Sequence, residues 1–279
     1  MSFLYKEREA DMTWLDEIDN ISYDEKTEWE ILRFPSVDST NDALKRMGPV
    51  EKGHCRVAVA CRQTRGRGRQ GREFLSPADK GIYMSLCFCP EGSSDQWNGL
   101  TTWTVVGMCD AIAAACGVRP GIKWPNDIVL SGKKVGGILT ETLMDPETLL
   151  PRSVVIGIGV NVLQTEADFT ECGLSAKAGS LRQLLGKAPA LPCLANEMLG
   201  ALQKIVDGFP KEKEKYLERY RLDCVTCGKK ILLFSETGTQ EALAECVEDD
   251  FSLKVRYSDG KSERISWGEV SVRGMYGYA

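Results

Sequence analysis

The stretch Arg62-Gln63-Thr64-Arg65-Gly66-Arg67-Gly68-Arg69-Gln70-Gly71-Arg72 decides how the first half of the chain folds. Its eleven residues include five arginines and three glycines. The apolar runs on either side, residues 56–61 (RVAVAC) and 81–89 (GIYMSLCFC), are typical of buried strands. The pattern therefore predicts a loop between two strands, in which glycines let a ligand approach the backbone and arginines offer planar donors to a carboxylate or phosphate.

The segments outside this loop predict an α/β domain with a mixed sheet. Residues 30–34 (EILRF) have the pattern of a strand, and Ser39 or Thr40 can cap a helix that ends at Gly48. Residues 100–117 are apolar on every face and end at a glycine, which predicts a buried helix. Further predicted elements are strands at 121–124, 127–130, 134–143 and 153–162, a mobile loop with a short helix over 164–192, and a long helix over 194–221.

The last 60 or so residues have a different character. Short strand patterns at 229–235, 242–247, 252–258 and 264–267 are separated by turn signals, with no helical pattern between them. We therefore predict three parts: an N-terminal extension over 1–28 with a short helix, a mixed-sheet α/β domain over 29–221, and a small SH3-like β-barrel over 222–279.

Composition excludes several classes of protein. The chain has 279 residues, with 35 Lys and Arg against 40 Asp and Glu, so its net charge of −5 gives no general attraction to nucleic acid or anionic lipid. No stretch approaches the roughly 18 apolar residues of a membrane helix, and we expect no membrane association. The acidic N-terminus lacks the features of a secretory signal, which predicts a cytoplasmic location.

Eleven cysteines are a high count, but the number is odd and many of them lie in apolar runs, so a disulfide framework is not expected. Cys224 and Cys227 form a CxxC pair. No second pair follows at zinc-finger spacing, and His54 is the only histidine, so we expect the pair to be incidental.

Two nucleotide-binding motifs nearly match the arginine loop, and context excludes both. Gly66, Gly68 and Gly71 fit a dinucleotide fingerprint, but Pro77 and a strand follow where that fingerprint needs a helix. The same glycines have Walker A spacing, yet Arg72 stands where the phosphate-binding lysine belongs. A nucleic-acid-binding tract rich in Arg and Gly stays open as an alternative.

Two further motifs carry chemistry. In residues 121–130 (GIKWPNDIVL), Lys123 precedes a Trp-Pro kink, where it can face a cleft and neutralise charge on a reacting phosphoryl or acyl group. An exposed strand lysine is the alternative interpretation. Gly157, Gly159 and Asn161 end an apolar strand, where the glycines admit a ligand to the backbone and Asn161 supplies amide donors and acceptors.

Together, the motifs resemble those of the biotin protein ligases over about residues 31–273. The matching segments, in family order, are Asp38-Ser39-Thr40-Asn41, Gln63 with 66–72, 123–127 (KWPND), 134–139 (KVGGIL) and 157–161 (GIGVN). Residues 268–273 are similar to the C-terminal β domain of that family. One departure is Glu73-Phe74, where the family commonly has Lys-Trp, and this puts the family's contact at that position in doubt.

The resemblance implies a catalytic domain of the biotin/lipoate ligase type and a two-step reaction. Biotin and MgATP give biotinyl-5′-adenylate, and a lysine of a biotin carboxyl carrier domain then takes the biotinyl group. Lys123 and Arg69 are the expected catalytic residues. The expected substrate-binding residues are Ser39, Thr40, Asn41, Gln63, Gly66, Arg67, Gly68, Arg69, Arg72, Lys123, Gly157, Gly159 and Asn161.

The same resemblance sets the expected cofactors and partners. ATP and Mg²⁺ act as co-substrates, no permanent cofactor is expected, and the sequence identifies no metal ligands. Segments 65–72 and 164–178 are candidates to close over the hydrolysis-prone adenylate. Residues 1–28 stand where repressor members of the family carry a winged-helix domain, so no DNA binding is expected. A homodimer is left open.

Three alternatives remain. A lipoate or octanoate ligase uses the same fold and adenylate chemistry but would be expected to carry an Arg-Arg-x-x-Gly-Gly-Gly loop, which this sequence lacks. A nucleic-acid-binding protein would need a broad basic face. A biotin-binding domain without catalysis would have no use for Lys123 and Arg69.

Overall fold

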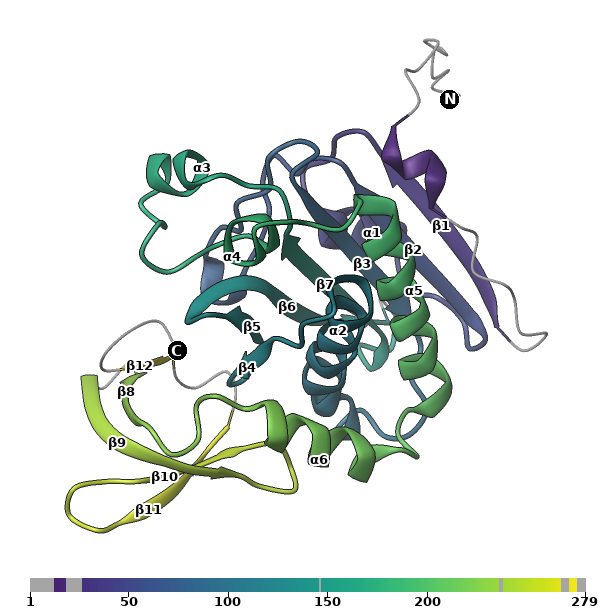
Figure 1. The fold of residues 1–279 in the computed structure, drawn as a ribbon. Coiled ribbons are helices and arrows are strands. Elements are labelled where there is room, and N and C mark those ends of the chain that lie inside the picture. The colour runs from purple at the N-terminus through teal and green to yellow at the C-terminus, as the bar shows by residue number, and fades with distance from the viewer. Residues whose placement is uncertain (1–12, 19–26, 146, 236–237, 267–270, 275–279) are drawn as a thin grey trace.

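A seven-stranded mixed sheet forms the centre of the larger part of the protein (Figure 1). The structure is a computed structural model that describes residues 13–18, 27–145, 147–235, 238–266 and 271–274. The sheet has the order β1-β2-β3-β7-β6-β5-β4. Its strands are β1 (Glu28–Phe34), β2 (His54–Ala60), β3 (Gly81–Phe88), β4 (Gly121–Lys123), β5 (Asp127–Leu130), β6 (Lys133–Met144) and β7 (Pro151–Asn161).

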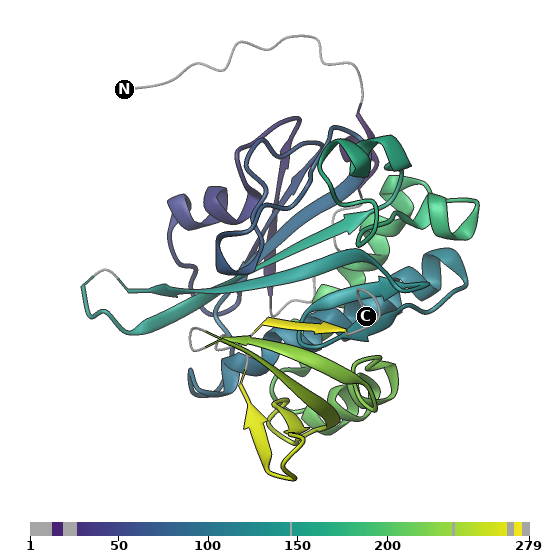
Figure 2. The same ribbon diagram turned by 90° about the vertical axis from the view of Figure 1, so that its left-hand side faces the viewer.

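The pairing makes the sheet mixed, as the sequence predicts. β1 and β2 run parallel, joined by helix α1 (Thr40–Met47), and every other neighbouring pair is antiparallel. The long strands β6 and β7 form a hairpin that projects from the body of the protein (Figure 2). Helix α1 packs on β2, β3 and β7, with Leu44 buried against Ala58, Cys87 and Val155.

Helices α2 (Leu100–Cys116) and α5 (Leu191–Gly208) pack against each other, α2 contacting β6 and α5 contacting β3 (Figure 1). With the 3₁₀ turn that precedes it, α2 extends over Gln96–Cys116 and, by length and composition alone, is apolar enough to cross a membrane. The expectation that no such stretch exists is therefore wrong. Because 67% of its apolar window is buried inside the protein, the helix is a core helix.

The long helix predicted over 194–221 is two helices. α5 ends at Gly208, and α6 (Lys213–Asp223) begins after Phe209 and Pro210. Proline lacks the N–H that an uninterrupted helix needs and disfavours helical geometry in the residue before it, so the break falls at this pair. The segment 164–192 holds two short helices where one was predicted, α3 (Glu166–Glu171) and α4 (Leu181–Leu185).

Part of the N-terminal extension packs on the α/β domain. The predicted short helix is the 3₁₀ turn Trp14–Glu17, and Leu15 and Ile18 are only 2% and 3% exposed. Arg33 of β1 donates hydrogen bonds to the carbonyl oxygens of Leu15 and Ile18, each at 3.0 Å. Residues 1–12 and 19–26 lie outside the described residues.

The C-terminal part is a five-stranded antiparallel sheet in the order β11-β10-β9-β8-β12, which confirms a small β domain after the mixed sheet. Its strands are β8 (Lys230–Ser235), β9 (Gly238–Val247), β10 (Leu253–Arg256), β11 (Ser262–Ile265) and β12 (Ser271–Gly274). Residues 267–270, which include part of the family-like segment 268–273, lie outside the described residues. The boundary placed at 221/222 stays a prediction.

Candidate active site

A cavity of about 640 Å³ brings most of the predicted site together. It lies between the start of α1, the loop that joins β2 to β3, the β4–β5 turn, the first half of β6, the C-terminal end of β7, and residues 169–178. Twelve of the thirteen predicted site residues line it: Ser39, Thr40, Asn41, Gln63, Arg67, Gly68, Arg69, Arg72, Lys123, Gly157, Gly159 and Asn161.

Gly66 is the exception and lines a neighbouring hollow on the surface. A Cβ atom at this position would lie 2.4 Å from the carbonyl oxygen of Phe74 and 2.5 Å from Oγ of Ser76. The absence of a side chain at Gly66 therefore lets the two arms of the loop approach each other, and it leaves no space that a ligand could fill.

The start of α1 presents a hydrogen-bonded set of small polar groups to the cavity. Ser39 caps the helix, as predicted, by accepting from the backbone N–H of Asp42 at 3.4 Å. Gln63 Oε1 accepts from the backbone N–H of Thr40 at 2.8 Å and from its hydroxyl at 3.1 Å. Ser85 of β3, which sequence reasoning missed, lies 2.7 Å from Thr40 Oγ1. This wall is rigid because its groups bond to one another.

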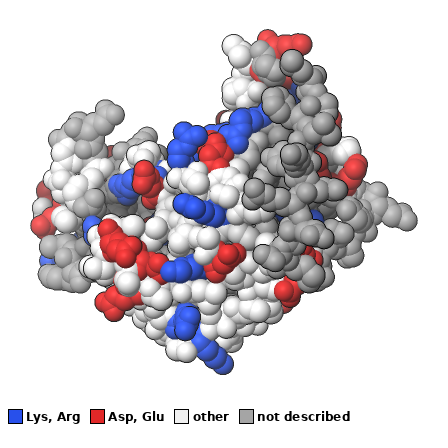
Figure 3. All heavy atoms as spheres, turned by 90° about the horizontal axis from the view of Figure 1, so that it is seen from above, with Lys and Arg blue, Asp and Glu red and all other residues white. Residues whose placement is uncertain are grey.

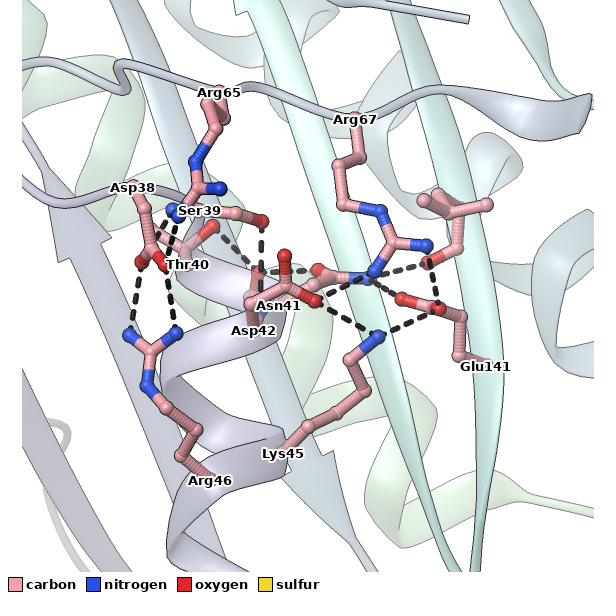
Figure 4. Close-up of polar contacts among 12 residues, drawn as sticks. Asp38, Ser39, Thr40, Asn41, Asp42, Lys45, Arg46, Arg65, Arg67 and Glu141 are labelled. Atoms are coloured by element: carbon pink, nitrogen blue, oxygen red, sulfur yellow. Dashed lines mark hydrogen bonds and ion pairs between the residues drawn. The ribbon is translucent and has the colours of Figure 1, made fainter. Parts of the chain in front are cut away.

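Glu141 of β6 ties this wall to the arginine loop (Figure 4). Its carboxylate accepts from Asn41 Nδ2 at 2.9 Å and from Lys45 Nζ at 2.8 Å, and lies 3.5 Å from Arg67 Nη2. Arg67 also donates to Asp42 at 2.6 Å. Glu141 was also missed by sequence reasoning, because nothing in the sequence links β6 to α1.

The pKa values around Glu141 follow from these contacts. Burial alone would raise the pKa of Asp42, but hydrogen bonds from Lys45 and Arg67 outweigh it and lower that pKa. Burial alone would lower the pKa of Lys45, yet hydrogen bonds to Glu141 and Asp42 raise it. Asp42 and Lys45 therefore both stay charged near neutral pH.

The arginine loop is a folded excursion between β2 and β3. The Phe74 N–H donates to the Gly66 carbonyl at 2.9 Å, and the Gly68 N–H donates to the Arg72 carbonyl at 2.7 Å. Its tip is the single 3₁₀ turn Arg69–Gly71, after which the chain runs into β3. The helix that a dinucleotide fingerprint or Walker A motif requires does not follow, in agreement with the sequence argument.

The arginines of this loop are in different surroundings. Arg65 and Arg67 contact carboxylates on α1 and just before it: Arg65 lies 3.4 Å from Asp38, and Arg67 bonds to Asp42. On the face seen in Figure 3, basic and acidic side chains are interspersed among uncharged ones, whereas a nucleic-acid interface would form a broad basic patch. Pairing within the protein therefore counts against the nucleic-acid alternative.

Arg69 turns toward the β4–β5 turn. Its Nη1 lies 3.2 Å from Oδ1 of Asn126, whose Nδ2 donates to the Ile138 carbonyl of β6 at 2.6 Å. Burial is the main reason that the pKa of Arg69 is lowered, and the charge of Asp127 opposes the shift. An arginine remains a cation under such a shift, so the loop presents a partly desolvated positive charge to the cavity.

Lys123 is buried in the cavity wall, with 5% of its surface exposed. The alternative interpretation of an exposed strand lysine is wrong. Lys123 ends β4, paired with Asp127 of β5, and Asp127 forms an ion pair with Lys134 at 2.5 Å. The next residue, Trp124, donates from its backbone to Thr226 Oγ1 at 2.9 Å and from its indole to the Phe251 carbonyl at 3.0 Å.

Gly157 and Gly159 make room for groups of the protein. A Cβ at Gly157 would lie 2.2 Å from Asn41 Oδ1, and one at Gly159 would lie 2.5 Å from the Phe74 ring. The expectation that these glycines leave their space to a ligand is therefore corrected, although both still line the cavity. Phe74, at the Glu73-Phe74 departure from the family pattern, thus fills part of the site.

Asn161 is held in place by the protein as well as facing the cavity. Its Nδ2 donates to the Gly179 carbonyl at 3.1 Å, and its Oδ1 accepts from Gln164 at 3.2 Å. The bond to Gln164 joins β7 to the predicted closing segment 164–178, and the bond to Gly179 lies just after that segment. Residues of the segment that also line the cavity are Phe169, Leu174, Ala176, Lys177 and Ala178. Closure of this segment or of the arginine loop stays a prediction.

Comparison with known proteins shows which class this fold and site resemble. The sequence matches the Biotin/lipoate A/B protein ligase family over residues 33–161. The Aquifex aeolicus biotin protein ligase, solved in complex with biotin and ATP, superposes with a TM-score of 0.69 at 26% identity, over 88% of this chain and 99% of that chain. In sequence and fold the chain is thus similar to the biotin/lipoate ligase class.

Curated relatives with similar sequences are biotin protein ligases. The bifunctional ligase/repressor BirA of Bacillus spizizenii is 40% identical over 161 residues, which are 58% of this chain and 46% of the relative. The biotin–[acetyl-CoA-carboxylase] ligase of Mycobacterium tuberculosis is 28% identical over 219 residues, 77% of each chain. The match thus spans about half the length of the Bacillus relative. Within this class, the relatives to which the chain is similar are biotin protein ligases.

Proposed function

We propose that the protein is an ATP-dependent biotin protein ligase. The observation that carries the proposal is the cavity, in which buried Lys123 and partly buried Arg69 share one space with the polar wall built on Thr40, Asn41 and Gln63. One cavity thus holds two kinds of group. Its cations suit a reaction between two anions, and its amide and hydroxyl groups suit a polar, uncharged ring system. The Aquifex relative, solved with biotin and ATP, supports this choice of substrates.

In the first step, a carboxylate oxygen of biotin attacks the α-phosphorus of ATP. The bond from that phosphorus to the bridging oxygen breaks, and pyrophosphate leaves. Both reactants are anionic, so catalysis depends on neutralising their repulsion and the charge on the phosphoryl group. We assign this work to Lys123 and Arg69, because a cation in a desolvated wall acts more strongly than one in water.

In the second step, the amine of a carrier-domain lysine attacks the acyl carbon of biotinyl-5′-adenylate. The amine loses a proton, an amide bond forms, and AMP leaves. The adenylate hydrolyses readily, so the walls must exclude water between the two steps. We assign that exclusion to the arginine loop and to residues 164–178, because residues of both segments line the cavity.

We propose that Mg²⁺ enters with the triphosphate of ATP, as part of the substrate. Among the described residues, no group of three or more His, Cys, Asp or Glu side chains could hold a metal ion. The phosphate oxygens and water supply the ligands that Mg²⁺ prefers.

Biotin-dependent exchange of pyrophosphate into ATP tests the proposal. The wild-type chain should catalyse exchange with biotin and not with lipoate. Lys123→Ala should lose roughly 100-fold or more of the rate, which is the scale expected when a group that stabilises transition-state charge is removed. Exchange with lipoate in place of biotin would identify a lipoate ligase, and no exchange with either acid would refute the adenylation step.

A further inference from the structure

The CxxC pair that the sequence left without a role lies in the connection between the two sheets. Cys224 caps the C-terminal end of α6, and Cys227 lies three residues before β8. The Cys227 thiol donates to the Cys224 sulfur at an Sγ–Sγ distance of 3.7 Å. Both residues are partly buried and not enclosed in the core.

The turn that holds the pair is bonded to the strand that carries Lys123. The Val225 N–H donates to the Ile122 carbonyl at 2.9 Å, and Thr226 Oγ1 accepts from the Trp124 N–H at 2.9 Å. These two bonds lie immediately before and immediately after Lys123 along β4. A change in the shape of the turn is therefore transmitted to the backbone of Lys123.

We propose that Cys224 and Cys227 form a redox-modifiable dithiol site, which small disulfides such as glutathione disulfide oxidise and whose closure displaces Lys123. The first half of the proposal concerns the cysteines alone. The second half, an effect on catalysis, rests on the proposed ligase function.

Oxidation of the pair proceeds by two thiol–disulfide exchange steps. The Cys224 thiolate attacks one sulfur of the small disulfide, which breaks that S–S bond and releases one thiolate. The Cys227 thiol then loses its proton and attacks the Cys224 sulfur, forming the Cys224–Cys227 bond and releasing the second thiolate. Two protein thiols are oxidised, one small disulfide is reduced, and the two protons end on the two small thiols.

The surroundings of the cysteines make Cys224 the reactive one. The hydrogen bond from Cys227 stabilises the Cys224 thiolate and lowers the pKa of Cys224, whereas the pKa of Cys227 is raised by the same bond. Burial raises the pKa of Cys55 and Cys61 to about 12. Thiol–disulfide exchange proceeds through the thiolate, so oxidation should select Cys224.

Closure changes the geometry by a measurable amount. A disulfide requires the sulfur atoms to approach to roughly 2.05 Å from the 3.7 Å seen in the dithiol. The sulfur atoms must therefore approach by roughly 1.6 Å, and any backbone movement that goes with this falls in the turn that holds β4 on both sides of Lys123. A misplacement of about 1 Å in a catalytic group costs up to roughly 100-fold in rate.

The test uses the full chain equilibrated in glutathione buffers of increasing oxidised fraction, followed by trapping of free thiols and peptide mapping. We expect a Cys224–Cys227 disulfide as the first oxidised species in the wild type and in Cys193→Ser, a control at an exposed cysteine. In Cys227→Ser the mapped product should be a glutathione adduct on Cys224. Oxidation that first joins Cys227 to Cys246, or that spreads equally over the exposed cysteines, would overturn the site.

The effect of oxidation on catalysis is measured as the rate of pyrophosphate exchange in the same samples. Exchange should fall roughly tenfold or more on oxidation and return on reduction, and Cys224→Ser/Cys227→Ser should show no response. A disulfide that forms without changing exchange would overturn the displacement of Lys123. If the reduced wild type shows no exchange at all, the ligase proposal fails, while the peptide map still decides whether the dithiol site exists.

Discussion

Gly157→Ala tests whether β7 needs glycine here because a side chain of the protein fills the space that a Cβ atom would take. The added Cβ would lie 2.2 Å from Asn41 Oδ1, and the oxygen must move by roughly 1 Å or more to reach an ordinary contact distance. Asn41 cannot move freely, because it is buried and bonds to Ser85 at 2.6 Å and to Glu141 at 2.9 Å. The substitution should therefore break both bonds.

The size of the effect follows from these two bonds. A neutral hydrogen bond contributes about 1 kcal/mol and one to a charged group about 1.5–3 kcal/mol, so Gly157→Ala should destabilise the wall by about 2–4 kcal/mol. If Asn41 contributes to the biotin site as proposed, biotin affinity should fall roughly 30-fold or more. Urea denaturation measures the first quantity, and calorimetric titration with biotin measures the second.

Gly200→Ala is the matched control. Gly200 lies inside α5, and a Cβ there has nothing within 4 Å, so alanine should raise the free energy of unfolding by about 0.5–1 kcal/mol through helix propensity. It should leave biotin binding unchanged. If Gly157→Ala binds biotin within about twofold of wild type and unfolds at the same urea concentration, the contact with Asn41 does not constrain the site.

Three further substitutions test other parts of the structure. Arg46 holds the pKa of Asp38 at about 2, below its unfolded value, so this stability is present above about pH 4 and is lost as pH falls toward 2. Asp38→Asn should thus cost about 1–2 kcal/mol at pH 7 and clearly less at pH 3 in urea denaturation, and an equal loss at both pH values would contradict it. Glu141→Gln removes the charge beside Lys45 and Arg67 and should speed tryptic cleavage of the arginine loop by roughly 3- to 10-fold, whereas an unchanged rate would show that Glu141 does not hold the loop. Leu15→Ala should lower the free energy of unfolding by about 2–4 kcal/mol, and a loss below about 0.5 kcal/mol would mean that the N-terminal turn adds nothing to the core.

The strands and the arginine loop could be predicted because their signals are local. An apolar run such as 56–61 predicts a strand, and the glycines and Pro77 around the loop exclude a helix there. The break between α5 and α6 was also predictable, since Pro210 stands inside the helical pattern. Hydrophobic periodicity alone predicts one helix that continues past Pro210.

The polar partners of the site could not be predicted, because they come from distant elements. Ser85 and Glu141 are 44 and 100 residues from Asn41 in the chain, and only the sheet order β3-β7-β6 brings them to one side chain. The same holds for Gly157, because a glycine in a strand indicates close approach without saying what approaches. Here the approaching group is Asn41, not the ligand that the motif favoured.

Hydrogen bonds next to Lys123 tie the C-terminal part of the chain to the α/β domain. The family match ends at residue 161, yet the groups that hold Trp124 beside Lys123 are Thr226 and the Phe251 carbonyl. Trp124 is buried, so removing both acceptors would leave two buried N–H donors unsatisfied, each at a cost of about 1–3 kcal/mol. Such a loss would weaken the anchoring of the β4–β5 turn, next to the cation that the proposed reaction needs. The C-terminal part of the chain therefore holds the turn that follows Lys123.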